Sequence, residues 1–481
     1  MSKFYLTTAI PYVNAKPHIG HALEFVQCDV IARYHRLIGD ETRLLSGADE
    51  NALKNVQAAE KAGKPIQEFV DENSQAFIDL SKAYHVQIDV FQRGSDKEKH
   101  YPASQKLWEL CNNNGDIYQK EYEGLYCVGC EMFYAEDELD EQGECFHHPG
   151  KKLEKVSEKN YFFKLSKYQE QILDLITKDT LKIIPRERKN EILGFLKEPL
   201  QDISISRTNE RAKNWGVPVP GDDTQKMYVW FDALNIYQSG VGFGWDDEQY
   251  KTWWPADAQV IGKDIIRFHA VYWPAFLLSA GLQPPRQLYV HGFITSQGQK
   301  MSKTVGNVID PITFLEKYGV DAVRYYLLRE VPSGKDGDVS DDRFKEVYNA
   351  DLANGLGNLI SRVAKLAHKH DLMIPVRNRP NQLMEDVGAL VRDFKFDKAL
   401  EVIWMSIANL DKYINRKEPW RQTKQESLKT LQEIIIGIEG LASLVDIGEA
   451  LQPFLPQTAE KMLKQFGGEK VTIQQPYFKR L

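Results

Sequence analysis

Two histidines near the N-terminus stand where a loop could bind phosphate groups. His18 and His21 enclose Gly20 in the segment His-Ile-Gly-His, which follows a strand-like stretch at 4–10 and opens an apolar repeat of helical spacing over 19–37. Two imidazoles three residues apart project from one side of the first helical turn, the helix N-terminus adds partial positive charge, and Gly20 lets a flat purine approach the backbone. The segment predicts a nucleotide cradle, although a His-x-x-His pair alone is more often incidental.

A second motif is rich in lysine. The segment 300–304 reads Lys-Met-Ser-Lys-Thr, with Gly298 before it and Gly306 after it. Lysines on a glycine-flanked loop can move, and the ammonium groups of Lys300 and Lys303 would stabilise the charge that develops on a departing pyrophosphate. A lysine-rich loop alone is usually just a solvated loop. Together the two motifs are more specific, because they lie in order at opposite ends of one predicted sheet.

Three of the five cysteines crowd into one short region, which favours a metal site over a disulfide framework. A Cys-x-x-Cys pair, fourteen further residues and a Cys-x-x-His pair supply the ligands of a closed, structural tetrahedral zinc site. The predicted ligands are Cys127, Cys130, Cys145 and His148. His147 could replace His148, and free or redox-active thiols would not explain a histidine at that offset. Cys28 and Cys111 are expected to be buried apolar residues.

Strand and helix patterns alternate along the first part of the chain. Further strands are predicted at 42–46, 228–231, 259–261 and 287–290, and this alternation indicates a parallel sheet with crossover helices. The pattern breaks near residue 120, resumes near 225, and gives way after about 341 to long amphipathic helices. The sequence therefore predicts an α/β fold whose sheet is split by an inserted module and followed by a helical bundle.

Length and composition narrow the class of protein. A chain of 481 residues is long enough for several domains, and no stretch approaches the roughly 20 apolar residues that span a bilayer. The strand-like stretch begins directly after Lys3, which leaves no room for a signal peptide and predicts a cytoplasmic protein without membrane contact. The net charge of -7 gives no sign of a nucleic-acid partner, so any RNA contact requires a local basic surface.

The two motifs resemble the HIGH and KMSKS signatures of class I aminoacyl-tRNA synthetases. The segments 9–14, 228–234 and 261–269 are similar to pocket segments of the methionyl-tRNA synthetases, and the resemblance covers essentially the whole chain. It implies that ATP, with Mg²⁺, activates L-methionine to methionyl adenylate and pyrophosphate, and that the methionyl group then passes to tRNA(Met). The catalytic residues would be His18, His21, Lys300 and Lys303, and ATP would also contact Gly20, Gly262 and Asp264.

The resemblance also implies a methionine pocket. Its expected residues are Ile10, Tyr12, Asp49, Trp230, Tyr237 and His269. A thioether side chain is long, flexible and polarizable, so the faces and edges of aromatic rings hold it well. The carboxylate of Asp49 would accept hydrogen bonds from the ammonium group of the substrate. Without the resemblance, buried tryptophans and tyrosines are more often plain core.

An RNA-binding end is expected in the helical part. Asn358 and Arg362 lie one helical turn apart, and Trp420 follows a basic stretch and would stack on an unpaired base. In the family the matching residues contact the CAU anticodon. Without that match, a solvated amphipathic helix would be the better interpretation.

These predictions combine into one architecture, a Rossmann-like parallel-sheet catalytic domain split by a zinc-knuckle connective insertion and followed by an all-α anticodon-binding bundle. The expected segments are the first half of the catalytic domain at 1–115, the connective insertion with the zinc knuckle at 116–222, the second half of the catalytic domain at 223–292, the KMSKS loop with a stem-contact region at 293–345, and the anticodon-binding helices at 346–481.

The chain departs from the family pattern in a few places. The loop 48–52 reads Ala-Asp-Glu-Asn-Ala where Thr-Asp-Glu-His-Gly is frequent, and Thr304 replaces a usual serine. The chain ends at Leu481 without the dimerising domain of some relatives, so a monomer is expected.

Four other classes of protein share some of these features but fit the sequence less well. A cysteinyl-tRNA synthetase would hold zinc at its active site, and Ala9 and Ile10 leave no cysteine there. The valine, isoleucine and leucine enzymes carry an editing insertion for which this chain is too short. A small-molecule nucleotidyltransferase would not need the helical end. An inactive tRNA-binding paralogue is disfavoured because both motifs keep their charged residues.

Overall fold

The computed structural model describes residues 2–127, 132–134, 139–140, 142–145, 153–296, 298–300, 309–375, 377 and 379–481. The chain divides into two compact units. Unit 1 comprises Met1–Pro17, Glu41–Ser81 and Gln87–Val290, and unit 2 comprises His18–Asp40, Lys82–Val86 and His291–Leu481.

Unit 1 is built on a six-stranded sheet with the strand order β3-β2-β1-β12-β13-β7. The strands are β1 (Lys3–Thr7), β2 (Glu41–Ala48), β3 (Val90–Arg93), β7 (Lys182–Ile184), β12 (Ala258–Gly262) and β13 (Gln287–His291). β1 pairs in parallel with β2 and β12, β2 pairs in parallel with β3, and β13 pairs in parallel with β7. The prediction of an α/β fold with a parallel sheet is confirmed.

Two predicted strands differ from the structure. The first strand ends at Thr7 rather than at residue 10, so Ile10 and Tyr12 lie in the loop beyond it. The strand predicted at 228–231 is wrong, because Val229–Ala233 forms the short helix α7. A run of aromatic and β-branched residues favours a strand by propensity, but these side chains are buried on all sides and tertiary packing overrides that preference.

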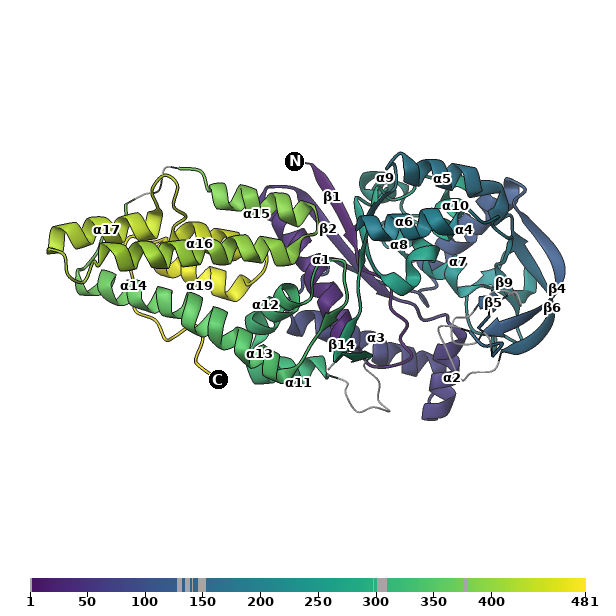
Figure 1. Cartoon of the computed structure of the whole chain (residues 1–481). Helices are drawn as coiled ribbons and strands as arrows, with labels where there is room; N and C mark the ends of the chain where they lie inside the picture. The colour runs from purple at the N-terminus through teal and green to yellow at the C-terminus, as the bar shows by residue number, and fades with distance from the viewer. Residues whose placement is uncertain are drawn as a thin grey trace. The chain divides into compact units, whose positions relative to one another are not determined.

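The inserted segment forms two antiparallel sheets, with strand orders β5-β4-β6-β8 and β10-β11-β9. Their strands are β4 (Ile117–Cys127), β5 (Met132–Tyr134), β6 (Glu154–Phe163), β8 (Ile203–Ser204), β9 (Ser206–Thr208), β10 (Pro218–Val219) and β11 (Asp222–Met227). The long strands β4 and β6 lie side by side in Figure 1. One strand from the same stretch, β7, joins the six-stranded sheet through β13.

Helices pack around these sheets in unit 1. They are α2 (Leu53–Ala62), α3 (Ile66–Ala83), α4 (His100–Asn113), α5 (Gln169–Thr177), α6 (Arg186–Phe195), α7, α8 (Ile236–Ser239), α9 (Asp247–Trp253) and α10 (Trp273–Ser279), with 3-10 turns at Leu165–Tyr168 and Lys263–Ile265 and a π-helical turn at Phe268–Tyr272. In the core, the rings of Phe163 and Phe276 lie 4.9 Å apart and those of Phe231 and Phe276 lie 4.8 Å apart. One aromatic core therefore joins the insertion to α7 and α10.

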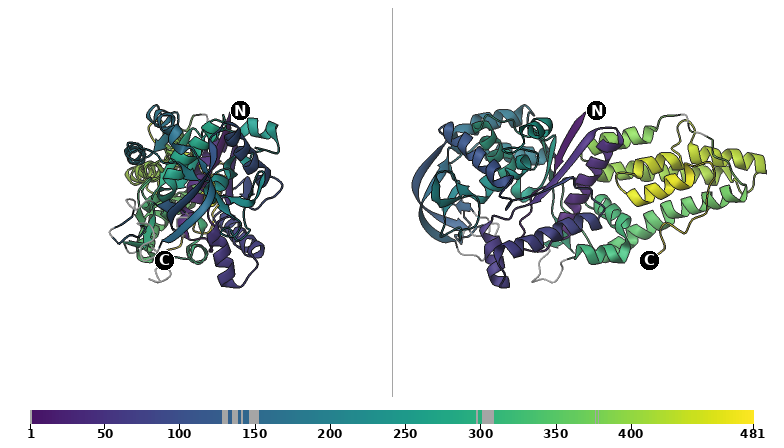
Figure 2. Two further views of the ribbon diagram at one scale, coloured as in Figure 1. Left: turned by 90° about the vertical axis from the view of Figure 1, so that its right-hand side faces the viewer. Right: turned by 180° about the vertical axis from the view of Figure 1, so that it is seen from behind.

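Unit 2 consists mainly of helices, and those of its C-terminal part run alongside one another in green to yellow in Figure 1 and in the rear view of Figure 2. They are α1 (Ile19–Leu37), α11 (Pro311–Tyr318), α12 (Val320–Glu330), α13 (Asp341–Val347), the π-helical stretch Tyr348–Gly357, α14 (Asn358–Lys369), α15 (Gln382–Arg392), α16 (Phe396–Lys417), α17 (Lys424–Ile436), α18 (Leu444–Leu451) and α19 (Pro456–Phe466). A small sheet of β14 (Ile294–Ser296), β15 (Gln299–Lys300) and β16 (Gly337–Asp338) completes the unit. The helical C-terminal part agrees with the sequence-based prediction.

A buried arginine connects α1 with the helices of the bundle. Arg324 of α12 donates to the carbonyls of Tyr84 (3.0 Å), Pro453 (2.9 Å) and Phe454 (2.8 Å). Its Nη2 also lies 2.8 Å from Oδ2 of Asp29 in α1, and both side chains are fully buried. Since a buried guanidinium needs acceptors for all its donors, this residue fixes three chain segments at once.

None of the described helices is both long and apolar enough to cross a membrane. The five segment boundaries, the cytoplasmic location and the monomeric state stay predictions.

Candidate active site

The carboxyl ends of β1 and β2 bring two predicted pocket segments together in unit 1. Tyr12 and Asp49 form a parallel bridge, and the Asp49 amide donates to the Pro11 carbonyl at 2.9 Å. The Asp49 carbonyl accepts from Nδ2 of Asn55 at 2.9 Å, and Asp49 is buried. Ile10 is partly buried and packs against the aromatic core. The loop that carries Asp49 is thus held from both sides.

An aromatic wall stands beside this edge. The indole of Trp230 stacks on Phe268 with ring centroids 3.6 Å apart and nearly parallel planes, at 4°. Tyr12 meets Trp230 edge-on at 6.1 Å, and His269 does so at 6.3 Å. The buried Nε1 of Trp230 has no hydrogen-bond partner within the described residues. Sequence reasoning missed Phe268, because stacking between residues 38 positions apart leaves no local signal.

His269 has a defined tautomer. Its Nδ1 lies 2.9 Å from the Ile265 carbonyl, which can only accept, so Nδ1 carries the proton and Nε2 accepts from the Tyr237 hydroxyl at 2.8 Å. Burial lowers the pKa of His269 to about 4, so the ring is neutral near pH 7. The Tyr237 carbonyl in turn accepts from the Tyr5 hydroxyl at 2.6 Å. These contacts fix two of the predicted methionine-pocket residues.

Gly262 and Asp264, two of the predicted ATP contacts, lie at the end of another strand of the same sheet. β12 ends at Gly262, and Asp264 is exposed in the 3-10 turn that follows without capping it. Because carboxyl ends of parallel strands share one edge of a sheet, Asp264 lies on the edge that also carries Asp49. Lys54 of α2, which sequence reasoning did not single out, places its Nζ 2.7 Å from the centre of the Tyr12 ring.

In unit 2, His18 and His21 form a reciprocal cap at the start of α1. The Gly20 amide donates to Nδ1 of His18, and the His18 amide donates to Nδ1 of His21, both at 3.1 Å. The two rings stack with centroids 3.9 Å apart. Because both Nδ1 atoms accept, each neutral ring carries its proton on Nε2. A Cβ at Gly20 would lie 2.9 Å from Cε1 of His18, so this cap itself requires glycine.

A third histidine accompanies this pair. Burial, followed by the nearby His18 and His291, holds the pKa of His21 well below its usual value, so His21 is neutral near pH 7. His291 lies with Nε2 2.9 Å from a Glu24 oxygen and Nδ1 2.8 Å from the Gly292 carbonyl. Both ring nitrogens of His291 therefore face oxygen atoms. The sequence signal for a functional role of His291 is limited to its place in a His-Gly pair directly after the strand predicted at 287–290.

The lysine motif begins on a hairpin of unit 2. Lys300 ends β15, and its backbone pairs with Thr295 of β14. Lys303 and Thr304 lie outside the described residues. The predicted meeting of the histidine and lysine motifs around one triphosphate is therefore not tested.

Two of the predicted zinc ligands are described, and both are buried. Cys127 ends β4, and the Sγ of Cys145 lies 3.4 Å from the Tyr134 hydroxyl. Tyr134 pairs across the hairpin with Leu125, so both thiols belong to one end of it. The remaining expected ligands are Cys130 and either His148 or His147, and all three lie outside the described residues. Within the part that is described, no three potential ligands cluster around a metal position.

The predicted anticodon residues occupy the surface of unit 2. Asn358 begins α14 and is exposed, and Trp420 follows α16 with 44% of its surface exposed. Arg362 forms an ion pair with Asp411 and donates to Oδ1 of Asn415 at 3.0 Å. Asp411 therefore fixes the direction of the guanidinium.

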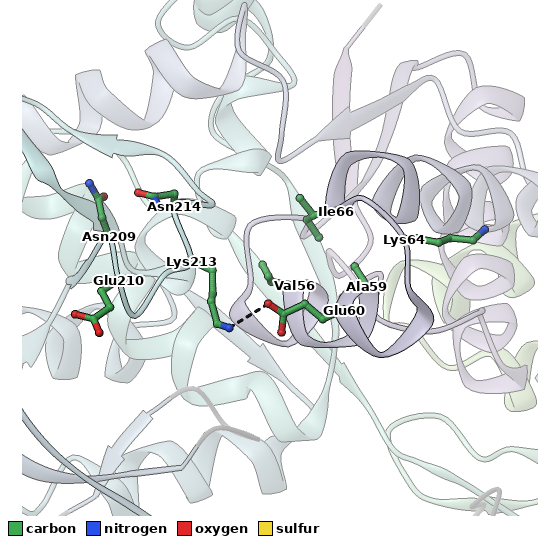
Figure 3. Close-up of a pocket in the computed structure, with 9 residues that line it drawn as sticks. All are labelled: Val56, Ala59, Glu60, Lys64, Ile66, Asn209, Glu210, Lys213 and Asn214. Carbon is green, nitrogen blue, oxygen red and sulfur yellow. Dashed lines mark hydrogen bonds and ion pairs between the residues drawn. The ribbon is translucent and has the colours of Figure 1, made fainter.

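A surface pocket of about 460 Å³ lies elsewhere in unit 1, between α2 and the loop 209–214 (Figure 3). An ion pair of 3.0 Å between Lys213 and Glu60 crosses it. Among the predicted substrate-binding residues that the structure describes, none lines this pocket.

The chain is similar to known proteins along nearly its whole length. The family described as tRNA synthetases class I (M) matches residues 4–364. A methionine–tRNA ligase of Brucella suis is 41% identical over 475 residues, which cover 96% of this chain and 91% of that protein. Its counterpart from Thermotoga maritima is 39% identical over 97% of this chain and 76% of its own length. The Mycobacterium tuberculosis methionyl-tRNA synthetase in complex with methionyl-adenylate superposes with a TM-score of 0.92 at 37% identity and covers 100% of both chains. The chain therefore belongs to the methionine group of the class I tRNA synthetases.

Proposed function

We propose that this chain is a methionine–tRNA ligase. It activates L-methionine with ATP and transfers the methionyl group to tRNA(Met) for translation. The observation that carries this proposal is the likeness to methionine–tRNA ligases at about 40% identity along nearly the whole chain. The aromatic wall at the sheet edge suits the side chain of methionine as the substrate.

Methionine recognition is assigned to unit 1. Asp49 accepts hydrogen bonds from the substrate ammonium group, and the aromatic faces of Trp230 and Tyr12 enclose the thioether. The buried indole N–H of Trp230 can point to the sulfur, which is a weak acceptor. Tyr237 and the neutral ring of His269 close the wall without introducing a charge.

The chemistry requires no protein nucleophile. A carboxylate oxygen of methionine attacks the α-phosphorus of ATP, and the bond from that phosphorus to the bridging oxygen of pyrophosphate breaks. A ribose hydroxyl at the tRNA terminus then attacks the activated carbonyl carbon, and AMP leaves. Catalysis consists of positioning and charge stabilisation.

The phosphate contacts are assigned to the two signature motifs. The protonated Nε2 atoms of His18 and His21 donate to phosphate oxygens, since both Nδ1 atoms are engaged with the backbone. Lys300 and Lys303 neutralise the departing pyrophosphate, and Lys303 makes the larger contribution. Gly262 lets the ribose approach, and Asp264 accepts from its hydroxyls.

Two metal ions are included in the proposal. Mg²⁺ accompanies ATP and supplies charge neutralisation on the phosphates. Zinc would be held by Cys127, Cys130, Cys145 and His148. The burial of the two described thiols at one end of a hairpin fits a closed structural site, which braces a small sheet.

Anticodon recognition is assigned to unit 2. Trp420 stacks on an unpaired base, while Asn358 and Arg362 contact base edges and phosphates. The exposure of Trp420 and Asn358 supports this assignment.

Amino-acid-dependent exchange of pyrophosphate into ATP, measured with each of the twenty amino acids, tests the proposal. Stimulation by methionine alone is expected. Stimulation by another amino acid would assign the pocket to it, and stimulation by none would indicate an inactive paralogue.

The role of Lys303 is tested in the same assay. Lys303→Ala is expected to slow exchange about 100-fold, because it removes charge stabilisation from the transition state. The matched control is Lys317→Ala, an exposed lysine of the same unit paired with Asp341, which should leave exchange unchanged. Equal rates for the two variants would exclude Lys303 from catalysis.

A further inference from the structure

A buried carboxylate lies behind the aromatic wall of unit 1. Asp232 is 2% exposed, and its Oδ1 accepts from Nε2 of His100 at 2.6 Å and from the Ser104 hydroxyl at 3.1 Å. Its Oδ2 accepts from Nδ2 of Asn51 at 2.6 Å. His100 also lies with Nδ1 2.8 Å from the Ser239 hydroxyl. We call these five residues the wall network.

The wall network connects segments that are far apart in sequence. Asn51 belongs to the loop after β2, and its Nδ2 also donates to the Gly94 carbonyl beyond β3 at 2.7 Å. His100 and Ser104 occupy the first turns of α4, Asp232 lies on α7, and Ser239 ends α8. All members are buried. A buried carboxylate with this many donors is a strong constraint on the segments that supply them.

Three members stand two positions after a pocket residue. Asn51 follows Asp49, Asp232 follows Trp230, and Ser239 follows Tyr237. Each helical residue is rotated by about 100° from the one before, so residues two apart on α7 or α8 point to roughly opposite sides. On α7 and α8, the pocket side chains therefore lie on one side of the helix and the members of the wall network lie on the other.

Building on the proposed function, we propose that Asp232 is a positioning residue, which through the wall network fixes the Asp49 loop, α7 and α8 relative to one another and so sets selectivity for methionine. A thioether offers few directional contacts, so the shape of the wall must provide the discrimination. One methylene in an apolar pocket changes specificity by roughly 10- to 200-fold, and that difference is lost when the wall can shift. Asn51 is the link that places the carboxylate-bearing loop.

The test compares two isosteric substitutions of buried carboxylates. Asp232→Asn replaces one carboxylate oxygen with an NH2 group. This new donor faces an N–H of either Asn51 or His100, so one hydrogen bond of the wall network is lost. Asp116→Asn does the same in a separate cluster of unit 1, where Asp116 accepts from Asn114 (2.7 Å), Lys167 (2.7 Å), Ser279 (2.8 Å) and Tyr168. Both variants are measured for thermal stability and for pyrophosphate exchange with methionine and with ethionine, which is longer by one methylene.

Asp232→Asn should raise KM for methionine about tenfold, the equivalent of roughly 1.4 kcal/mol, and lower the preference for methionine over ethionine by about fivefold. KM for ATP should stay within about twofold, since the network backs only the amino-acid wall. Asp116→Asn should lower the thermal stability by a similar amount. It should leave unchanged both KM for methionine and the preference for methionine over ethionine.

Ser104→Ala provides a milder variant if Asp232→Asn fails to fold. It removes the longest of the three bonds to Asp232 and should shift KM for methionine and the preference by about twofold in the same direction. Unchanged KM and preference in the variants that fold, with loss of stability alone, would overturn the inference. A wild-type chain without methionine-dependent exchange would instead refute the proposed function.

Discussion

Replacing the buried arginine of unit 2 should loosen one part of that unit selectively. Arg324→Leu keeps an apolar side chain in the space but removes all donors to the Tyr84, Pro453 and Phe454 carbonyls. It also removes the guanidinium that pairs with the buried Asp29, whose ion pair with Arg33, with Nε at 2.6 Å, remains. Both losses leave buried polar groups with fewer partners than in the wild-type chain.

The expected cost follows from these contacts. Removing one partner of a buried ion pair typically costs about 3–5 kcal/mol of unfolding free energy. The carbonyls that lose their donor contribute to this cost, so we expect Arg324→Leu to lower the free energy of unfolding by about 4 kcal/mol. The matched control is Arg343→Leu, whose exposed guanidinium pairs with Glu330 at 2.7 Å and Glu346 at 3.2 Å. An exposed pair of this kind contributes at most about 1 kcal/mol.

Hydrogen exchange followed by mass spectrometry measures the effect locally. Amides of α1, α12 and the segment 453–455 should exchange about 1000-fold faster in Arg324→Leu, because every 1.4 kcal/mol of opening free energy corresponds to roughly tenfold. Peptides of unit 1 serve as an internal reference. Exchange in α1 and α12 that stays within about threefold of the Arg343→Leu control would refute the reasoning.

Three further predictions concern the pocket, the RNA-binding surface and the metal. Because burial lowers the pKa of His269 to about 4, the unfolded chain binds a proton at this residue below pH 6.5, whereas the folded chain does not. The wild-type chain should therefore lose about 2 kcal/mol of unfolding free energy from this residue between pH 7.5 and 5. Urea titrations should show that His269→Gln lacks this loss. Equal pH dependence of both proteins would contradict the assignment. Trp420→Ala should raise KM for tRNA about tenfold or more in aminoacylation without changing the rate of pyrophosphate exchange. The control Met405→Ala, on the exposed face of α16, should change neither quantity. Similar KM values for the two variants would exclude base stacking by Trp420. Metal analysis should find zinc in the wild-type chain and in Cys111→Ser but not in Cys127→Ser, and equal zinc contents would remove Cys127 from the site.

Much of the fold could be predicted because local patterns and long-range packing agree. The apolar repeat from Ile19 matches α1 over its full length, and the buried runs at β2, β12 and β13 match their strands. The pocket residues could be placed at one sheet edge for a related reason. Parallel strands present their carboxyl ends together, so loops after different strands meet whatever their separation in sequence.

Other features depend on contacts that no local pattern encodes. The helix at Val229–Ala233 forms where propensity favours a strand, since the ring of Phe231 packs against Trp108 of α4 and Phe276 of α10. The stacking of Phe268 on Trp230 and the pairing of His291 with Glu24 join residues from distant segments. Sequence patterns identify which side chains are capable of such contacts, but the partner is decided by the tertiary fold.

The strand β7 makes the connective insertion inseparable from the sheet that it interrupts. Although it comes from the middle of the inserted stretch, it hydrogen-bonds to β13 and forms one border of the six-stranded sheet. Excising the whole stretch would uncover the backbone of β13 and create an unprotected edge prone to self-association. A shortened enzyme would therefore have to retain residues 182–184, and a natural loss of this stretch would require another segment to cover β13.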